Sequence, residues 1–242
     1  MKRILLSWSS GKDSAWALHV LKQNSEYEEY EIAGLLTTFN RAANRVAMHA
    51  VRRELVEAQA EAVGVPLWPV ELPWPCGNAD YEALMRAVCD KAVREGIGAV
   101  AFGDLFLEDV RAYREKQMRE TGLQPLFPIW GQPTTELARQ MIAAGLRAKL
   151  TCVDPKVLDQ SFAGREFDAR LLAELPSGVD PCGERGEFHS FAYAGPMFAR
   201  KLDVAVGEVV TRDGFVFADV NFSRPLRTNR AVPLARWTAP HT

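Results

Sequence analysis

Short hydrophobic runs alternate with longer amphipathic segments through the first half of the chain. The short runs are rich in apolar residues and have the length of strands, and they cover 3–8, 31–38, 67–72 and 99–102. The longer segments have the spacing or composition of helices, and they cover 15–21, 48–63, 81–93 and 108–120. Strands separated by helices predict a parallel, doubly wound α/β sheet, because right-handed crossovers place helices on both faces.

The second half of the chain breaks this alternation. Its patterns, in the order helix, strand and helix, cover 134–144, 148–153 and 168–175. Two hydrophobic runs, 202–211 and 215–222, then flank Arg212-Asp213-Gly214, and this arrangement predicts a β-hairpin. We therefore expect a large α/β domain, a smaller α+β domain and a tail, which cover 1–130, 131–225 and 226–242.

Length and composition are typical of a soluble enzyme. With 242 residues, of which 48% are hydrophobic and 25% charged, the chain can bury one large core, or a large and a small one. No apolar run approaches the roughly 20 residues that a membrane helix needs. The N-terminus enters a strand without the pattern of a signal peptide. We expect a cytoplasmic protein with no membrane partner, and the sequence leaves a homo-oligomer open.

Charge and cysteine content argue against two further classes. The formal net charge is −2, whereas general nucleic-acid binding needs an excess of Lys and Arg, so a nucleic-acid partner is not expected. The cysteines form no Cys-x-x-Cys pair, which indicates reduced thiols instead of a zinc site or disulfides; they are Cys76, Cys89, Cys152 and Cys182. A basic C-terminal stretch could contact RNA or a partner, although a solvated tail is the simpler interpretation; its cations are Arg224, Arg227, Arg230 and Arg236.

A loop of small and polar residues joins the first predicted strand to the first predicted helix; it consists of Ser9, Ser10, Gly11, Lys12, Asp13 and Ser14. Small residues let a polyanion approach the backbone, and free N–H groups at a helix start point toward it. The loop is not a Walker A motif, because Leu6 and Asp13 stand where that motif needs Gly and Ser or Thr. It predicts a phosphate-binding loop with Lys12 on phosphate. The alternative is an ordinary turn that caps a helix.

The loop matches the pattern Ser-Gly-Gly-x-Asp-Ser, with Ser10 in the place of the middle Gly. This PP-loop is similar to that of the N-type ATP pyrophosphatases, also called the adenine nucleotide alpha hydrolase-like group. The resemblance implies that ATP is cleaved between its α- and β-phosphates. The loop would hold the departing pyrophosphate while AMP passes to an acceptor oxygen.

Polar residues after the second and fourth predicted strands should meet the PP-loop at one edge of the sheet, where ligands bind. Backbone near Thr37 could recognise adenine, and Gly103 would let the sugar or the α-phosphate approach. Asp104 and Asp13 could hold Mg²⁺, which prefers carboxylate oxygens and arrives with the nucleotide. The alternatives are a helix N-cap for Asp104 and a contact with loop amides for Asp13.

A second dense group of polar residues occupies 178–190, where glycines, a proline and acids indicate a shaped loop. Glu184 and Glu187 could bind a cationic group, orient ammonia or take a proton from ammonium, and His189 could share that work at neutral pH. The alternative is a solvated acidic turn with His189 on a following strand. Two other histidines are expected to be packed or surface side chains; they are His19 and His49.

Four motifs that follow the PP-loop resemble, in their order, the diphthine-ammonia ligase family and its relatives; they are Phe102–Leu105, Pro128–Gly131, Thr151–Asp154 and Asp180–Ser190. The similarity covers about residues 3 to 222. It implies a nucleotide domain followed by a substrate domain, in which ATP activates the carboxylate of diphthine as an acyl-adenylate that ammonia attacks. It also assigns the PP-loop to ATP and Gly183–His189 to the substrate side.

One motif departs from the family. The ligases resemble Gly-Glu-Tyr-Glu-Thr where this chain has Gly-Glu-Phe-His-Ser at 186–190. An imidazole, that of His189, thus replaces a carboxylate, and this change of charge should alter the preferred acceptor. The expected partners are ATP, ammonia and a carboxylate, which is that of diphthine or another one on a small molecule or a modified protein.

Two other functions fit parts of the sequence. Some PP-loop enzymes thiolate tRNA with the help of two cysteines, and Cys76 and Cys182 could be such a pair, although the missing Cys-x-x-Cys motif and the acidic charge argue against it. A non-catalytic adenine-nucleotide-binding protein would keep the PP-loop. It would have no need for Glu184, Glu187 and His189 near the nucleotide.

Overall fold

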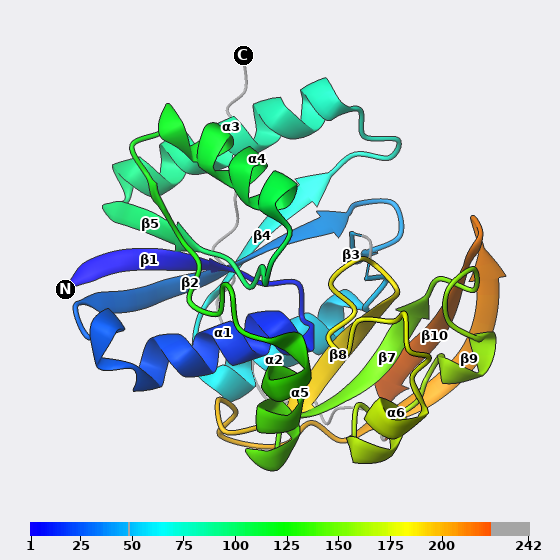
Figure 1. The fold of residues 1–242 in the computed structure, drawn as a ribbon. Coiled ribbons are helices and arrows are strands. Elements are labelled where there is room, and N and C mark those ends of the chain that lie inside the picture. Colours follow the sequence, from blue (N-terminus) through cyan, green and yellow to red (C-terminus); the bar gives the residue numbers. More distant parts are fainter. Residues whose placement is uncertain (48, 224–242) are drawn as a thin grey trace.

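The structure is a computed structural model that describes residues 1–47 and 49–223. The predicted tail, 226–242, and its four arginines, Arg224, Arg227, Arg230 and Arg236, lie outside the described residues. The chain forms two β-sheets, one in each half (Figure 1). This architecture confirms the expected fold class, whereas the predicted boundary near residue 130 stays a prediction.

The first sheet is parallel except for one short strand. Its parallel strands follow the order β4-β2-β1-β5-β6, and their bounds are Leu67–Leu72 for β4, Tyr30–Asn40 for β2, Lys2–Ser7 for β1, Ile97–Ala101 for β5 and Gln124–Leu126 for β6. Strand β3, Arg45–Val46, runs antiparallel to the end of β2. The carboxyl ends of β1, β2 and β5 therefore lie at one edge, where the PP-loop follows β1.

Helices cover both faces of this sheet. Figure 1 shows α3 (Asn78–Arg94) and α4 (Glu108–Arg119) on one face, with α1 (Lys12–Gln23) and α2 (Arg53–Val63) on the other. Successive side chains of β1 explain the two layers, because neighbouring strand residues face opposite sides. Ile4 and Leu6 pack with α1 and α2, whereas Leu5 packs with α3 and α4.

The second sheet is antiparallel, with the order β8-β7-β10-β9. Its strands are Phe188–Ala194 for β8, Arg147–Val153 for β7, Phe215–Phe222 for β10 and Val204–Arg212 for β9. Asp213 and Gly214, with φ of +51° and +83°, form the turn of the predicted β9–β10 hairpin. The remaining elements are α5 (Thr134–Ala143), α6 (Ala169–Glu174) and the 3₁₀ turns η1 (Ser25–Tyr27) and η2 (Gln160–Phe162).

Several elements differ from the sequence prediction in their bounds, and strands β3 and β6 were not predicted. Helix α2 begins at Arg53 instead of near residue 48, because the Val46 and Val51 backbones form a hydrogen bond of 2.8 Å and close a tight turn first. Strand β6 was not predicted, because its three residues at the sheet edge do not form a hydrophobic run. Strand β8 already begins at Phe188, so the end of the predicted 178–190 loop is extended chain.

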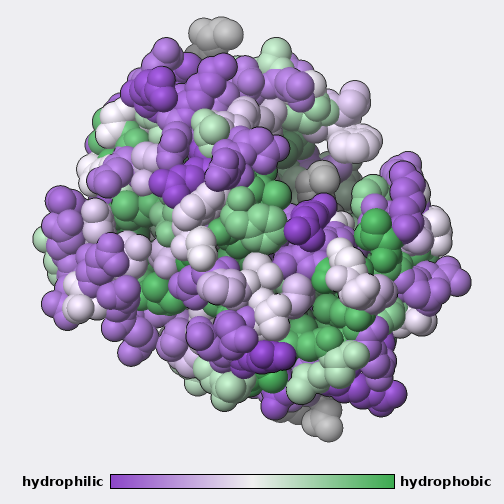
Figure 2. Space-filling view, viewed as in Figure 1, coloured by the Kyte–Doolittle hydropathy of each residue, from purple (hydrophilic) through white to green (hydrophobic). Residues whose placement is uncertain are grey.

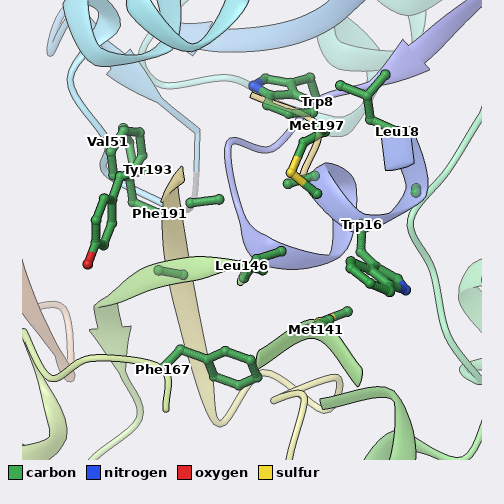
Figure 3. Packing of buried hydrophobic residues seen from close by; sticks show 14 of the residues in the cluster. Trp8, Trp16, Leu18, Val51, Met141, Leu146, Phe167, Phe191, Tyr193 and Met197 are labelled. Atoms are coloured by element: carbon green, nitrogen blue, oxygen red, sulfur yellow. The ribbon is translucent and has the colours of Figure 1, made fainter. Parts of the chain in front are cut away.

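The two halves share one hydrophobic core. Buried side chains of α1 and α2 belong to the same cluster as those of α5, β7 and β8. Figure 3 shows Trp8 and Trp16 from the first half in this cluster together with Leu146, Phe167 and Phe191 from the second. Hydrophilic residues instead gather over the outer faces of α3 and α4 (Figure 2). None of the helices in 1–47 and 49–223 is long and apolar enough to cross a membrane.

A buried amide ties the PP-loop to β8. Gln59 of α2 is fully buried, and its Oε1 accepts a hydrogen bond of 2.8 Å from Trp8 Nε1. Its Nε2 donates to the Ser10 carbonyl oxygen at 3.0 Å and to the carbonyl oxygen of Ala192 in β8. The Ala192 N–H donates to the same Ser10 oxygen at 2.9 Å. The loop is therefore fixed against both α2 and the second sheet.

We expect Gln59→Leu to lower the free energy of unfolding by about 2–3 kcal/mol, because it leaves the Trp8 N–H and the Ala192 carbonyl buried without a partner. Urea denaturation followed by fluorescence would measure the change. Gln140→Leu, on the exposed side of α5, is the matched control and should change stability by less than about 0.5 kcal/mol. Equal losses in the two variants would contradict a special role for Gln59.

Candidate functional site

The PP-loop is closed by its own side chains. Ser9 Oγ accepts a hydrogen bond from the Gly11 N–H at 3.3 Å and donates to Ser14 Oγ at 3.2 Å, while Ser14 Oγ donates to the Gly11 carbonyl oxygen at 3.0 Å. Ser10 is buried with φ of +69°, a conformation that glycine adopts without strain. This backbone explains why the pattern has Gly at that place. Gly11 is the N-cap of α1, so the first N–H groups of the helix lie directly behind the loop.

Lys12 points into the junction between the two halves. Its Nζ donates to Asp13 Oδ2 at 2.8 Å and to the Cys182 carbonyl oxygen. The same atom lies 5.6 Å from the ring centroid of Phe167 and 5.2 Å from that of Phe188, and the residue is only 2% exposed. Burial lowers the pKa of Lys12, but the charge and hydrogen bond of Asp13 together with the interactions with Cys182 and Glu184 outweigh it, so the pKa is raised and the ammonium stays protonated.

Asp13 is the half-buried partner of this lysine. Its Oδ2 accepts the bond from Lys12, whereas its Oδ1 is buried and has no hydrogen-bond partner among the described residues. Burial raises the pKa of the Asp13 carboxyl, although the charge of Lys12 opposes the shift. Both predicted roles of Asp13, as a metal ligand and as a partner of loop amides, therefore stay predictions.

Thr37 and Gly103 both face the protein instead of an open space. The Thr37 hydroxyl is buried and donates to the Trp8 carbonyl oxygen at 2.8 Å. A Cβ on Gly103 would lie 3.0 Å from the Asp13 carbonyl carbon and 3.0 Å from the Ser14 nitrogen. Gly103 thus lets β5 approach the first turn of α1. The nucleotide contacts predicted for Thr37 and Gly103 stay predictions.

Asp104 lies next to this contact and pairs with an arginine. Its Oδ2 accepts a hydrogen bond of 3.4 Å from Arg114 Nε of α4. Burial raises the pKa of the Asp104 carboxyl, and the charge of Arg114 opposes the shift. The N-cap of α4 is Leu107, so the alternative interpretation of Asp104 as a helix cap was wrong.

Glu184 comes from the second half and reaches the same place. Its Oε1 accepts a hydrogen bond of 2.7 Å from the Leu105 N–H, which follows Asp104 in the chain. Burial raises the pKa of Glu184 to about 7, and the negative charges of Asp13 and Asp104 act in the same direction. The structure therefore brings Asp13, Asp104 and Glu184 together at the carboxyl edge of the sheet.

Glu187 shapes the loop that carries Glu184. It is 5% exposed, and its two oxygens accept hydrogen bonds of 2.9 Å each from the Asp180 and Arg185 N–H groups. Asp180 Oδ2 in turn accepts from the N–H groups of Cys182 at 3.2 Å and Glu184 at 3.0 Å. Both carboxylates thus hold backbone instead of facing solvent, and the catalytic role predicted for Glu187 stays a prediction.

His189 lies on β8, as the alternative interpretation of this loop predicted. Its ring centroid is 4.4 Å from that of His49, whose Nδ1 is buried without a hydrogen-bond partner among the described residues. Burial and the nearby charge of Lys12 lower the pKa of His189 to about 4. The imidazole is therefore neutral at pH 7, and the catalytic role predicted for His189 stays a prediction. His19 is half-buried and packs on Trp16, as expected, with ring centroids 4.7 Å apart.

A cavity of about 650 Å³ extends from the PP-loop between the first sheet and helices α3 and α4. Its wall near the loop includes Ser9, the β2 residues Leu36 and Thr38, and the Asp104 partner Arg114. Cavities of this size commonly hold small molecules. Most of the remaining wall is apolar. The cavity therefore offers room for a nucleoside beside the phosphate-binding loop.

Sequence reasoning missed four residues that build this site, and they are Gln59, Arg114, Asp180 and Ser190. Ser190 Oγ accepts a hydrogen bond of 3.2 Å from the Lys12 N–H. Asp180 belonged to the recognised acidic motif, so its role could have been found from the adjacent glycines. Ser190 stood in the same motif, at its last position, whereas Gln59 and Arg114 gave no signal, because a Gln or an Arg within a helix has no defined function by itself.

The two cysteines proposed for tRNA thiolation, Cys76 and Cys182, give no support to such a site. Cys182 is 1% exposed, and its Sγ lies 3.5 Å from the Thr134 carbonyl oxygen. Burial raises the pKa of the Cys182 thiol, so it is a poor nucleophile. Cys76 instead lies at the wall of the cavity.

Within 1–47 and 49–223, no three His, Cys, Asp or Glu side chains are placed to hold a metal ion by themselves.

Known proteins match this chain in both halves. The family model of the diphthamide synthase N-terminal domain matches residues 1–125, and that of the C-terminal domain matches 133–220. Proteins named diphthine–ammonia ligase are 32% identical to the chain in Bos taurus, over 191 residues, and in Homo sapiens, over 189 residues; each match covers 72% of this chain and 71% of the relative. A relative of the same name from Danio rerio is 28% identical over 190 residues, 72% of this chain and 74% of its own. The PP-loop, the acidic edge and these matches together show that the chain belongs to the diphthamide synthase family.

Proposed function

We propose that this protein is an ATP-dependent ligase that activates a carboxylate as an acyl-adenylate and amidates it with ammonia. The observation that carries the proposal is the meeting of the PP-loop with Glu184 at one sheet edge, where Glu184 Oε1 binds the Leu105 N–H. The relatives named diphthine–ammonia ligase support the reaction class. They also favour it over tRNA thiolation and over nucleotide binding without catalysis.

The ATP side of the site consists of the loop from Ser9 to Ser14 and the adjoining cavity. The α1 N-terminus supplies free N–H groups and a positive dipole for the phosphates. The cavity begins at Ser9 and passes the end of β2, so the nucleoside would lie near Leu36 and Thr38. Cleavage between the α- and β-phosphates then leaves AMP on the acceptor, and pyrophosphate departs.

The acidic edge fits a magnesium ion that arrives with ATP. Mg²⁺ is usually held by one or two carboxylates together with substrate phosphates, so it needs no cage of three protein ligands. Asp13 Oδ1 is a buried oxygen that accepts no hydrogen bond from residues 1–47 and 49–223, and burial raises the pKa of Asp13 and of Asp104. These two residues would hold the ion. When bound, it would neutralise negative charge on the phosphates during transfer.

Glu184 is placed to act on the acceptor side. A carboxylate is a poor acyl donor until AMP is its leaving group, so ammonia must attack after adenylation. The attacking nitrogen has to lose a proton, and Glu184, with its pKa raised to about 7, is a suitable acceptor near neutral pH. The buried carboxylate of Glu187 keeps the Glu184 loop in shape.

The acceptor that the relatives support is the carboxylate of diphthine, since they are named diphthine–ammonia ligase. His189 stands where the resembling motif has a glutamate, and its neutral ring pairs with that of His49. This neutral pair removes one negative charge from the substrate side. A protein that carries diphthine is therefore the first acceptor to test, followed by other carboxylates.

We expect incubation with ATP, Mg²⁺, ammonium and a diphthine-bearing protein to yield AMP and pyrophosphate in equal amounts, measured by ion-exchange chromatography. Asp13→Asn should lower AMP formation about 100-fold, because the loop loses the charge that holds the ion and fixes Lys12. Asp90→Asn, on the exposed side of α3, is the matched control and should retain the rate. Formation of ADP in place of AMP would contradict the proposal.

Glu184→Gln should keep the Leu105 hydrogen bond but lower amide formation at least about 10-fold, since an amide cannot take a proton from ammonium. Binding of a non-hydrolysable ATP analogue, measured by calorimetry, should stay unchanged. Glu108→Gln, at the exposed start of α4, removes a nearby negative charge and serves as the control. If ATP affinity fell as much as turnover in Glu184→Gln, the assignment to the acceptor side would be wrong.

A further inference from the structure

We propose that Lys12 is a positioning residue, which holds the loop 180–187 against the PP-loop, and that it is not a ligand of the ATP phosphates. Its ammonium joins the two loops directly, through Asp13 Oδ2 on one side and the Cys182 carbonyl oxygen on the other. Asp13 belongs to the nucleotide loop, whereas Cys182 lies two residues before Glu184. One buried cation thus spans the two halves of the proposed reaction site.

The Lys12 side chain is buried and held in place by aromatic rings. The ring centroids of Phe167 and Phe188 lie 5.6 and 5.2 Å from Nζ, and the residue is 2% exposed. Lys12 does not line the 650 Å³ cavity that begins at Ser9. An ammonium that turned away toward a phosphate on the PP-loop would give up its contacts with the Cys182 carbonyl and both rings. That carbonyl would then be buried without the partner it now has.

Other contacts make the loop dependent on this lysine. Asp180 and Glu187 organise the loop internally, through hydrogen bonds to its own N–H groups. Such bonds shape the loop but do not attach it to the PP-loop. The Lys12 side chain provides that attachment, and the Lys12 N–H adds a bond of 3.2 Å to Ser190 Oγ just beyond the loop. Without the ammonium, Glu184 would keep its hydrogen bond to the Leu105 N–H, but its loop would lose the direct link to Asp13.

Cys182 offers a direct readout of this attachment. Its thiol is 1% exposed, so it should react with iodoacetamide only when the loop opens. The matched control lies in the same helix, because Lys22 Nζ also donates to a backbone carbonyl, that of Val63, at 3.1 Å. Lys12→Met and Lys22→Met therefore remove the same kind of bond. Only the first of these bonds joins the two loops.

We expect Lys12→Met to speed alkylation of Cys182, measured by mass spectrometry of its peptide, at least about 10-fold, while Lys22→Met leaves the rate near that of the native protein. The Kd for a non-hydrolysable ATP analogue should change less than about 5-fold in Lys12→Met. Lys12→Gln, whose amide can donate to the Cys182 carbonyl, should restore part of the protection. This variant also serves as the test if Lys12→Met does not fold.

An unchanged alkylation rate in Lys12→Met, or an increase in the Kd for ATP of about 5-fold or more, would overturn the positioning role. The role of Lys12 in turnover rests on the proposed function. In Lys12→Met we expect the KM for the acceptor to rise while the KM for ATP stays unchanged. The alkylation and ATP-binding measurements need no acceptor. If they succeed while no acceptor is amidated, the proposed function fails and the positioning role stands.

Discussion

The site depends on one carbonyl group, that of Ser10 in the PP-loop. It accepts hydrogen bonds from the Ala192 N–H at 2.9 Å and from Gln59 Nε2 at 3.0 Å, so a donor from strand β8 and a donor from helix α2 bind the same oxygen. The left-handed backbone of Ser10, with φ of +69°, turns the oxygen toward these donors. This contact fixes β8, the strand that follows the 180–187 loop, beside the nucleotide loop.

Charge balance explains the arrangement of acids around this contact. Asp13, Asp104 and Glu184 are gathered at one edge, and burial raises the pKa of each. Two cations oppose the accumulation, since Lys12 pairs with Asp13 and Arg114 pairs with Asp104. Glu184 accepts a hydrogen bond from the Leu105 N–H and lies within reach of the Lys12 charge, but burial outweighs both and raises its pKa to about 7. The same group is the one expected to exchange protons during amidation.

The alternation of strand-like and helix-like segments was sufficient to predict the layers of the first half, because the hydrophobic pattern of each segment is a local property of the chain. The PP-loop and the acidic loop could also be found, since glycines and acids stand out in sequence. The contacts between residues that are distant in sequence could not be predicted. Nothing local indicates that Lys12 turns to Cys182, that Glu187 binds backbone, or that His49 meets His189. Each contact joins residues far apart in sequence and exists only after the sheets pack.

The common core has a consequence for how such proteins can diversify. Side chains of α1 and α2, including Trp16 and Leu55, are covered by the second half and not by their own sheet alone. The halves are therefore not interchangeable modules, although separate family models describe them. A second half taken from a relative with another acceptor would have to match the first half's surface as well as its chemistry. Changes of acceptor by a few substitutions within the 180–190 loop disturb far less of the buried structure.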